Sequence, residues 1–200
     1  MARTAAKSGD EGTPETVRDR LLNTARDLFY REGARAVGVD MVVAQSGVAK
    51  TSLYRWFPSK DVLIAAVLEQ EAADRWSGWD RILERCDPAP REQLRAELSG
   101  IARFVSSPKY RGCPFMNVTA EFPDPEHPAR KIATGVMVEL RRRVAGLVDR
   151  IEGVRNREEL TDQLVLLIDG AFSSAQCLGP DGPQKYLLSA GDALIEAQLR

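Results

Sequence analysis

Hydrophobic residues recur along most of the chain at spacings of three and four, the period of one face of an α-helix. In the first such segment the apolar positions are Val17, Leu21, Ala25, Leu28 and Phe29. The strict alternation of apolar and polar residues that is typical of a half-buried strand is not found convincingly. The pattern therefore predicts an all-α protein of about nine helices.

Capping and breaking residues predict where the first helix begins and ends. Residues 1–12 are expected to form a disordered arm. Thr13 is the expected cap and Pro14 the first helical residue, because proline is tolerated where no backbone donor is needed. Gly33 is expected to end this helix.

The same signals divide the rest of the chain. Gly47 separates two short helices, proline at position 58 ends the second of them, and Ser59 is expected to cap a long helix with Asp61 in its first turn. A DPAP joint at 87–90 follows, then SSPKYRG at 106–112 and FPDPEHP at 122–128. The expected helices are about 39–46, 49–57, 59–85, 91–106, 113–121, a basic helix to about 151, 157–177 and 184–199.

The two short helices have the outline of a helix-turn-helix, whose second helix enters the major groove of DNA. Val42, Val48, Leu53 and Phe57 are expected to face inward. The rest of the second helix carries donors and flat aromatic rings, and no acidic residue occurs from 45 to 60, so phosphate oxygens are attracted. The candidate DNA contacts are Lys50, Thr51, Ser52, Tyr54, Arg55, Trp56 and Lys60.

Charge is distributed unevenly between the two parts of the chain. The net charge is −1, yet residues 1–60 carry ten Lys and Arg against seven Asp and Glu, a net of +3. Residues 61–200 carry eighteen against twenty-two, a net of −4. A basic front module on an acidic body supports a polyanionic partner at one end only.

The stretch GVAKTSLYRWFPSKDVL, residues 47–63, resembles the recognition-helix signature of the TetR family of bacterial regulators. The preceding segment LLNTARDLFYREG resembles the first helix of that family, and the likeness covers about residues 16–66. Gly38 stands where the family often caps the second helix with Thr or Ser, and Trp56 where it often has His or Tyr. The matching positions are Gly47, Val48, Leu53, Tyr54, Phe57, Ser59, Lys60 and Leu63, with Ala25, Leu28, Phe29 and Gly33 in the first helix.

The resemblance implies roles for the candidate DNA contacts. Lys50, Thr51 and Ser52 would lie at the groove-facing start of the recognition helix. Tyr54 and Lys60 would hold phosphates, with Arg55 and Trp56 flanking. Taken singly, Tyr54 could instead pack its ring on the fourth helix, and Lys60 could be a solvated lysine.

Large apolar and aromatic side chains interspersed with polar ones are concentrated in the middle of the chain, between the fourth and eighth helices. Such a set can line a small-molecule cavity. Taken singly, each residue is more typical of an ordinary core. The candidate effector-pocket residues are Trp76, Trp79, Phe104, Phe115, Met116, Met137, Phe172 and Gln176.

The last two helices have apolar faces wide enough to be buried on two sides, within the subunit and against a partner. The resemblance implies a two-fold dimer through this pair, and a purely intramolecular core is the alternative. The candidate dimer-interface residues are Leu164, Ile168, Ala171, Leu187, Ala190 and Leu194.

Other chemistry is sparse. His127 is the single histidine and lacks partners at metal-ligand spacing. Neither a metal nor a cofactor is therefore expected, and His127 is expected to be a surface or capping residue. Cys113 could have a lowered pKa and sense oxidants, or be a buried inert thiol. The run of arginines at 141–143 is expected to form a solvated face, with a secondary anion contact as the alternative.

These observations define the expected function. The longest purely apolar run, residues 62–68, is too short to span a bilayer, and no secretory signal is visible. The three cysteines are widely spaced, which suggests a reducing cytosol. We therefore expect a cytoplasmic protein without a membrane partner. We expect a ligand-responsive regulator, a repressor released from palindromic double-stranded operator DNA by a small-molecule effector, and a homodimer. Residues 13–58 would bind DNA, and residues 59–200 would bind effector and dimerise. The sequence lacks the motifs that an enzyme would need. A helical adaptor that binds another protein is the remaining alternative.

Overall fold

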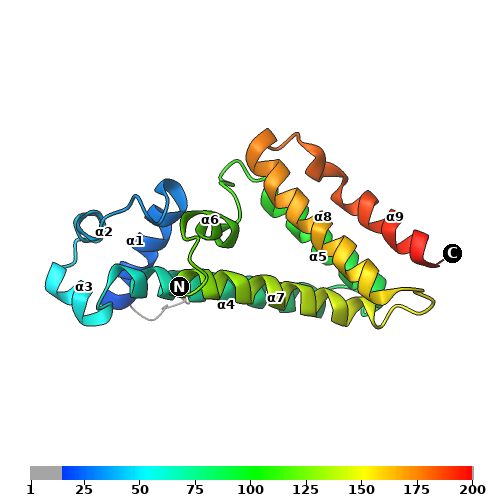
Figure 1. Cartoon of the computed structure of the whole chain (residues 1–200), viewed down its shortest axis with the longest axis horizontal. Helices are drawn as coiled ribbons and strands as arrows, with labels where there is room; N and C mark the ends of the chain where they lie inside the picture. The colour runs from blue at the N-terminus through cyan, green and yellow to red at the C-terminus, as the bar shows by residue number, and fades with distance from the viewer. Residues whose placement is uncertain (1–14, 200) are drawn as a thin grey trace, which may run out of the picture.

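The computed structural model describes residues 15–199, and within them every regular element is a helix, which confirms the all-α prediction (Figure 1). None of the helices in this range combines the length and the hydropathy that crossing a bilayer requires. A short 3₁₀ helix, Pro183–Tyr186, precedes the last element. The α-helices are α1 (Val17–Glu32), α2 (Val39–Ser46), α3 (Lys50–Trp56), α4 (Lys60–Arg85), α5 (Pro90–Val105), α6 (Pro114–Glu121), α7 (Pro128–Val148), α8 (Arg157–Leu178) and α9 (Leu187–Leu199).

The cap of α1 differs from the one predicted. Thr16 is the N-cap, and its hydroxyl accepts a hydrogen bond from the Asp19 backbone N–H at 3.1 Å. The Asp19 carboxylate in turn accepts from the backbone N–H of Thr16, completing a capping box. Thr13 and Pro14, and the predicted arm at 1–12, lie outside the described residues. The reciprocal Thr–Asp pair places the start of the described helix three residues later than the sequence signals suggested.

The later ends follow the sequence with two exceptions. Gly47 ends α2 in the left-handed conformation with φ 66°, and the Ser59 hydroxyl caps α4 by accepting from the Val62 N–H. Helix α7 ends at Val148 and not near Ile151, which lies in the following turn but is buried and so prolongs the apolar pattern. The last α-helix starts at Leu187, because the residues expected to open it form the 3₁₀ turn.

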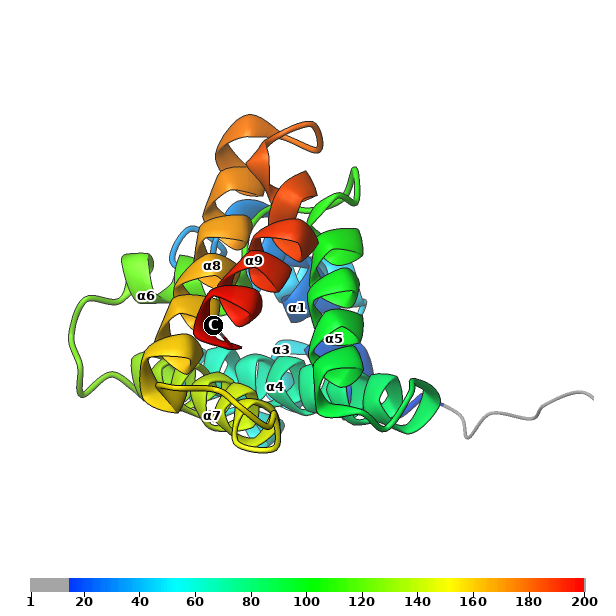
Figure 2. The same ribbon diagram turned by 90° about the vertical axis from the view of Figure 1, so that its right-hand side faces the viewer.

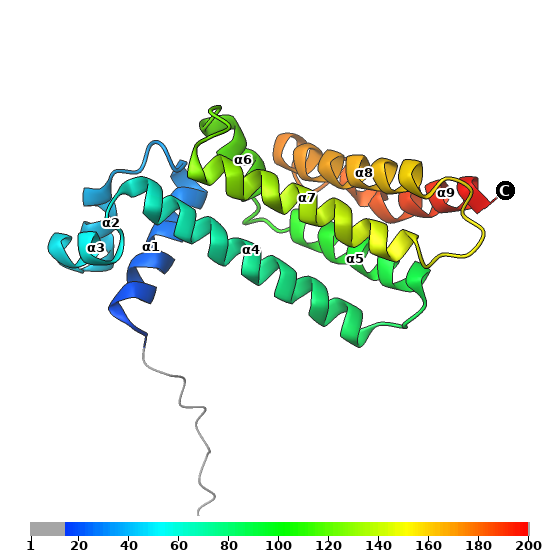
Figure 3. The same ribbon diagram turned by 60° about the horizontal axis from the view of Figure 1, so that its bottom comes forward.

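Helix α4 runs from the helix-turn-helix end of the molecule to the opposite end, with α7 alongside it (Figures 1 and 3). Helix α1 packs against the first part of α4, and α5 packs against its later part. Viewed from the end, α5 and α8 rise from this base, and α9 lies against both (Figure 2). The chain therefore connects the two ends of the molecule through one continuous helix.

Helix α9 approaches α5 closely because position 191 has no side chain. A Cβ on Gly191 would lie 2.5 Å from Leu98 Cδ1, closer than side chains tolerate. Gly191 is buried, as are Leu98 on α5 and Ile195 one turn further along α9. Gly191 thus serves packing within the subunit.

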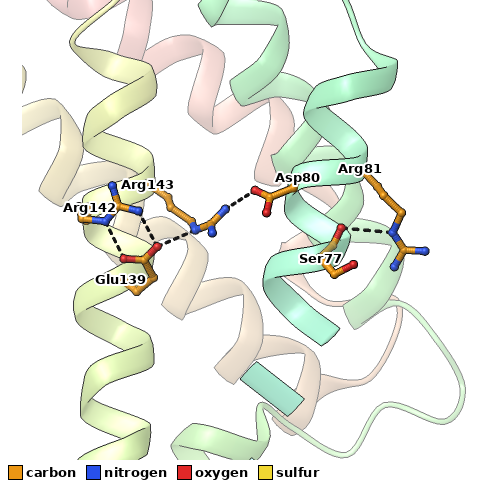
Figure 4. A network of polar contacts seen from close by, with 6 residues as sticks. All are labelled: Ser77, Asp80, Arg81, Glu139, Arg142 and Arg143. Carbon is orange, nitrogen blue, oxygen red and sulfur yellow. Dashed lines mark hydrogen bonds and ion pairs between the residues drawn. The ribbon is translucent and has the colours of Figure 1, made fainter. Parts of the chain in front are cut away.

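Ion pairs hold α7 against its neighbours (Figure 4). Arg143 on α7 donates to Asp80 on α4 at 2.5 Å and to Glu139 at 2.8 Å. Hydrogen bonds from Arg142, together with those from Arg143, hold the pKa of Glu139 at about 2. Arg141 pairs with Asp162 on α8 at 2.6 Å. Arg141 and Arg142 are exposed, as expected of a solvated face, whereas Arg143 is half-buried between α7 and α4. Each of the three guanidinium groups has a carboxylate partner.

Candidate nucleic-acid interface and effector cavity

The helix-turn-helix buries the residues that the spacing predicted would face inward. Leu53 is fully buried and Phe57 is 2% exposed, and Val42 and Val48 are buried with them. The Arg18 guanidinium on α1 lies 5.7 Å from the centre of the Phe57 ring. Because Leu53 and Phe57 anchor α3 to the module, the opposite side of this helix is fixed toward solvent.

The outward side of α3 carries the predicted DNA contacts. Tyr54 is 44% exposed and Trp56 is 49% exposed, so two aromatic side chains of one short helix meet solvent close together. Lys50, Thr51 and Arg55 are exposed too, and Ser52 is half-buried. The ring of Tyr54 is thus not buried against α4, and donors and aromatic faces meet solvent together.

Lys50 has a partner that the local sequence did not indicate. Its Nζ lies 2.6 Å from Asp40 Oδ1, at the start of α2. The hydrogen bond that it donates to Asp40 raises the pKa of Lys50 above its ordinary value. Asp40 lies just outside the acid-free stretch from 45 to 60, so only the fold brings this carboxylate to the face of α3.

Lys60 is held by the backbone that follows α1. Its ammonium donates to the Arg35 carbonyl at 2.8 Å, and the side chain is half-buried at the first turn of α4. Desolvation lowers the pKa of Lys60 from its ordinary value. This lysine is therefore not simply solvated: it links α4 to the α1–α2 loop and presents its remaining N–H donors beside the module.

A cavity of about 400 Å³ lies between α4, α5, α8 and the start of α6. Four of the eight predicted pocket residues line it: Trp79, Phe104, Phe115 and Phe172. The walls also include charged residues that the aromatic pattern did not indicate, namely Arg26, Glu71, Asp74, Arg75, Glu97 and Arg103. The spacing of charges along amphipathic helices gave no signal that these six would converge.

The other four predicted pocket residues do not line this cavity. Trp76 is partly buried and packs on the core, with the Arg143 guanidinium of α7 4.7 Å from its ring centre. Met116 and Met137 are partly buried and pack on the core. Gln176 is exposed and donates to Asn117 Oδ1 on α6 at 3.2 Å. Helical rotation decides these placements, because neighbouring residues of one helix point in different directions.

The deepest polar groups of the cavity are Arg75 and Glu97. The Nε atom of Arg75 and the Oε1 atom of Glu97 are buried and have no hydrogen-bond partner among the described residues. Burial raises the pKa of Glu97 to about 8, against the opposing effect of Arg75. Burial also lowers the pKa of Arg75. Both shifts reflect the cost of placing charge away from water.

A second charged cluster connects the cavity wall to the DNA-binding module. Arg26 on α1 pairs through Nε with Glu71 and through Nη1 with Asp74 at 2.9 Å, both on α4. The Tyr30 hydroxyl on α1 donates to the Gly112 carbonyl and accepts from the Arg111 N–H at 2.8 Å. Residues 111 and 112 immediately precede the cavity-lining Cys113–Phe115 segment.

The single histidine caps a helix, and the candidate redox cysteine is buried. His127 caps α7, its Nδ1 accepting from the Ala129 N–H at 3.2 Å, as expected of a capping group. Cys113 is 3% exposed, and burial raises its thiol pKa, opposite to the shift that a reactive thiol needs. Across residues 15–199, no group of three or more His, Cys, Asp or Glu side chains is arranged to hold a metal ion.

The candidate dimer residues separate into two sets. Leu164 and Ile168 are fully buried inside the subunit, because this side of α8 faces its own neighbours, so neither can contact a partner directly. Ala171, Leu187, Ala190 and Leu194 line an outward groove of about 550 Å³ between α8 and α9, although Ala171 and Leu187 are themselves buried and only Ala190 and Leu194 are partly exposed. Leu166, which widens the apolar face of its helix, and Tyr186 also line this groove and are exposed.

A helix-turn-helix with an outward α3, carried by an all-α body, is the architecture of a DNA-binding transcriptional regulator. Residues 21–67 match the model of the family described as "Bacterial regulatory proteins, tetR family". The crystal structure of SCO4454, a TetR-family transcriptional regulator from Streptomyces coelicolor, is 31% identical, with a TM-score of 0.87 over 92% of this chain and 96% of that one. The chain belongs to the TetR family.

Further relatives agree with this assignment. The structure of sav143 from Streptomyces avermitilis is 29% identical, with a TM-score of 0.77 over 92% of this chain and 98% of that one. The HTH-type transcriptional activator FasR of Mycolicibacterium smegmatis is 34% identical over 88 residues, which are 44% of this chain and 40% of FasR. The chain thus spans less than half the length of the curated relatives that it matches.

Proposed function

We propose that the protein is a homodimeric, cytoplasmic repressor that leaves palindromic operator DNA when a small molecule binds. Residues 13–58 bind DNA, and residues 59–200 carry the dimer interface and the effector site. The outward face of α3 is the observation that carries the proposal. Its basic and aromatic groups are solvent-exposed, while Leu53 and Phe57 fix the helix from behind.

The proposed DNA contacts divide by position on the module. Lys50, Thr51 and Ser52 form the first turn of α3 and read base edges, since the N-terminal residues of a recognition helix reach the groove. Arg55 and Trp56 flank the groove, where the Arg55 guanidinium reaches a phosphate at its border, and Tyr54 and Lys60 hold further phosphates. DNA that contacts Lys50 has to displace Asp40, so the Asp40 carboxylate competes with DNA for the Lys50 ammonium.

Salt dependence tests this interface. Removing one phosphate-binding cation should lower the slope of log K against log salt by about 0.9. Binding of selected duplex fragments, measured by mobility shift at several salt concentrations, should show this drop for Arg55→Ala. Arg85→Ala, the same charge change at the opposite end of α4, is the matched control and should leave the slope unchanged. Equal slopes for the two variants would contradict the assignment.

The second subunit is proposed to pack against α8 and α9. The outward groove between these helices is apolar, and Leu166 is 73% exposed beside it. A two-fold axis through this face would bury the same side chains from both subunits. Pairing would place two recognition helices on one side of the dimer, as half-sites about 34 Å apart require.

The cavity is proposed to communicate with DNA through two connections. The first is α4, which joins the cavity wall at Arg75 directly to Lys60 at the module. The second is the segment before α6, whose Gly112 and Arg111 backbone groups hold Tyr30 of α1. A ligand that moves either element changes the separation of the recognition helices. A coupling of about 1–3 kcal/mol already changes affinity about 5- to 150-fold.

Repression is tested by placing a bound operator fragment upstream of a reporter gene. Deletion of the regulator should raise expression if it represses. One curated relative is named a transcriptional activator, so a fall in expression is the result that would overturn this part of the proposal.

A further inference from the structure

The cavity holds two buried polar groups that do not satisfy one another. Arg75 projects from α4 and Glu97 from α5, and the two form no ion pair with each other. Glu97 is only 4% exposed, and its Oε1 has no partner among the described residues. Buried polar groups are nearly always hydrogen-bonded, so a pair left open inside a cavity marks a place for a ligand.

The surroundings decide which charge the ligand carries. At one edge of the cavity Arg26 pairs with both Glu71 and Asp74, and Arg103, which also lines the cavity, supplies the second positive charge that balances the two carboxylates. Arg75 instead lies against two rings, with its Cζ 5.4 Å from the centres of Trp76 and Phe172, which provide no hydrogen-bond acceptor in the ring plane. Burial raises the pKa of Glu97 to about 8, which favours the neutral acid over the carboxylate near neutral pH. Arg75 forms no hydrogen bond or ion pair among the described residues, although the carboxyls of Glu97 on α5 and Asp169 on α8 both lie near enough to act on its charge.

We propose that the cavity binds a compact organic acid, whose carboxylate accepts hydrogen bonds from the Arg75 guanidinium and lies beside the Glu97 carboxyl group. The body of this ligand is apolar or aromatic and packs on Trp79, Phe104, Phe115 and Phe172. The guanidinium fork matches a carboxylate in two parallel hydrogen bonds, which gives both strength and orientation. This inference deepens the proposed function and rests on it only in taking this cavity as the effector site.

Three probes with one apolar body separate the possible charges. 1-Naphthylacetate carries the carboxylate, 1-naphthylacetamide is its neutral counterpart, and 2-(1-naphthyl)ethylammonium is a cation. Isothermal titration calorimetry on the full chain at pH 7 should show the acid binding about tenfold or more tightly than either other probe, as a charge-assisted pair demands. Tighter binding of the ammonium would assign recognition to Glu97 and overturn the proposal, and equal binding of all three would overturn it as well.

Two variants test whether Arg75 causes the preference for the acid over the amide. Arg75→Met should bring acid and amide to equal affinity while leaving amide binding intact, which also shows that the cavity has kept its shape. Arg103→Met is the matched control, because Arg103 lines the same cavity but is exposed and donates to Ser99 on its own helix. An acid preference that survives in Arg75→Met would refute the role of Arg75.

The assignment of an acidic ligand and the release of DNA by a ligand are refuted by different results. If the acid binds with the expected preference but leaves operator affinity unchanged, the ligand assignment stands and ligand-induced release is wrong. If no probe shows charge preference yet a neutral compound weakens operator binding, release stands and the acid assignment is wrong.

Discussion

Leu166→Glu tests the proposed dimer face with little effect on the isolated subunit. Leu166 lies on the outer side of α8, and 73% of its surface meets solvent in the subunit. A glutamate there can point into water, so the fold should persist. In a two-fold dimer the same position is buried twice, and each copy brings a charge into an apolar groove.

The magnitude follows from the exposed area. Fully burying a leucine is worth about 1.5–3 kcal/mol, so burying the exposed fraction of Leu166 is worth about 1–2 kcal/mol per subunit. Two subunits give about 2–4 kcal/mol, which raises the dimer Kd about 30- to 700-fold before any cost of the buried charge is added.

Sedimentation equilibrium over a range of concentrations measures this change. Val138→Glu, on α7, is the matched control, because Val138 is 64% exposed but does not line the groove. We expect Leu166→Glu to sediment as a monomer where the parent and the control are dimers, and to bind operator DNA weakly. If the two variants have the same dimer Kd as the parent, the interface lies on another face.

Three further predictions concern polar side chains. Asp40→Asn should tighten DNA binding about three- to tenfold by freeing Lys50 and removing a charge that repels phosphate, and a mobility-shift titration that finds weaker binding would contradict the proposed competition. Tyr30→Phe should leave operator affinity nearly unchanged but reduce the factor by which a bound ligand lowers it, because the variant lacks the hydroxyl that holds the segment before α6; an undiminished factor in a DNA-binding titration would exclude this route. Burial favours neutral Glu97 in the folded state, and this contribution to stability is complete below the ordinary pKa of 4.5 and is lost as the pH rises toward about 8. The free energy of unfolding in urea should therefore fall by up to about 1.4 kcal/mol per pH unit in this range. Glu97→Gln should flatten that decline, and parallel pH profiles for parent and variant would count against the buried acid.

The local sequence determined the helices and the outline of the DNA-binding module. Gly47 favours the left-handed turn that ends α2, and Ser59 supplies the hydroxyl that caps α4, so both boundaries depend on residues next to them. The spacing of Leu53 and Phe57 likewise fixes which side of α3 is buried. These predictions hold because capping and amphipathicity depend on residues within one or two turns.

Tertiary structure alone decided which side chains from different helices meet. Asp40 reaches Lys50 only because the α2–α3 turn brings the start of each helix together. Arg75 and Glu97 come from separate helices, and nothing in their own neighbourhoods distinguishes them from surface charges. The apolar face of α8 is continuous in sequence, but the packing of α5, α7 and α9 buries Leu164 and leaves Leu166 outside. Burial is a property of the assembled core and not of the helix, which is why hydrophobic spacing could predict the helix but not the exposed part of its face.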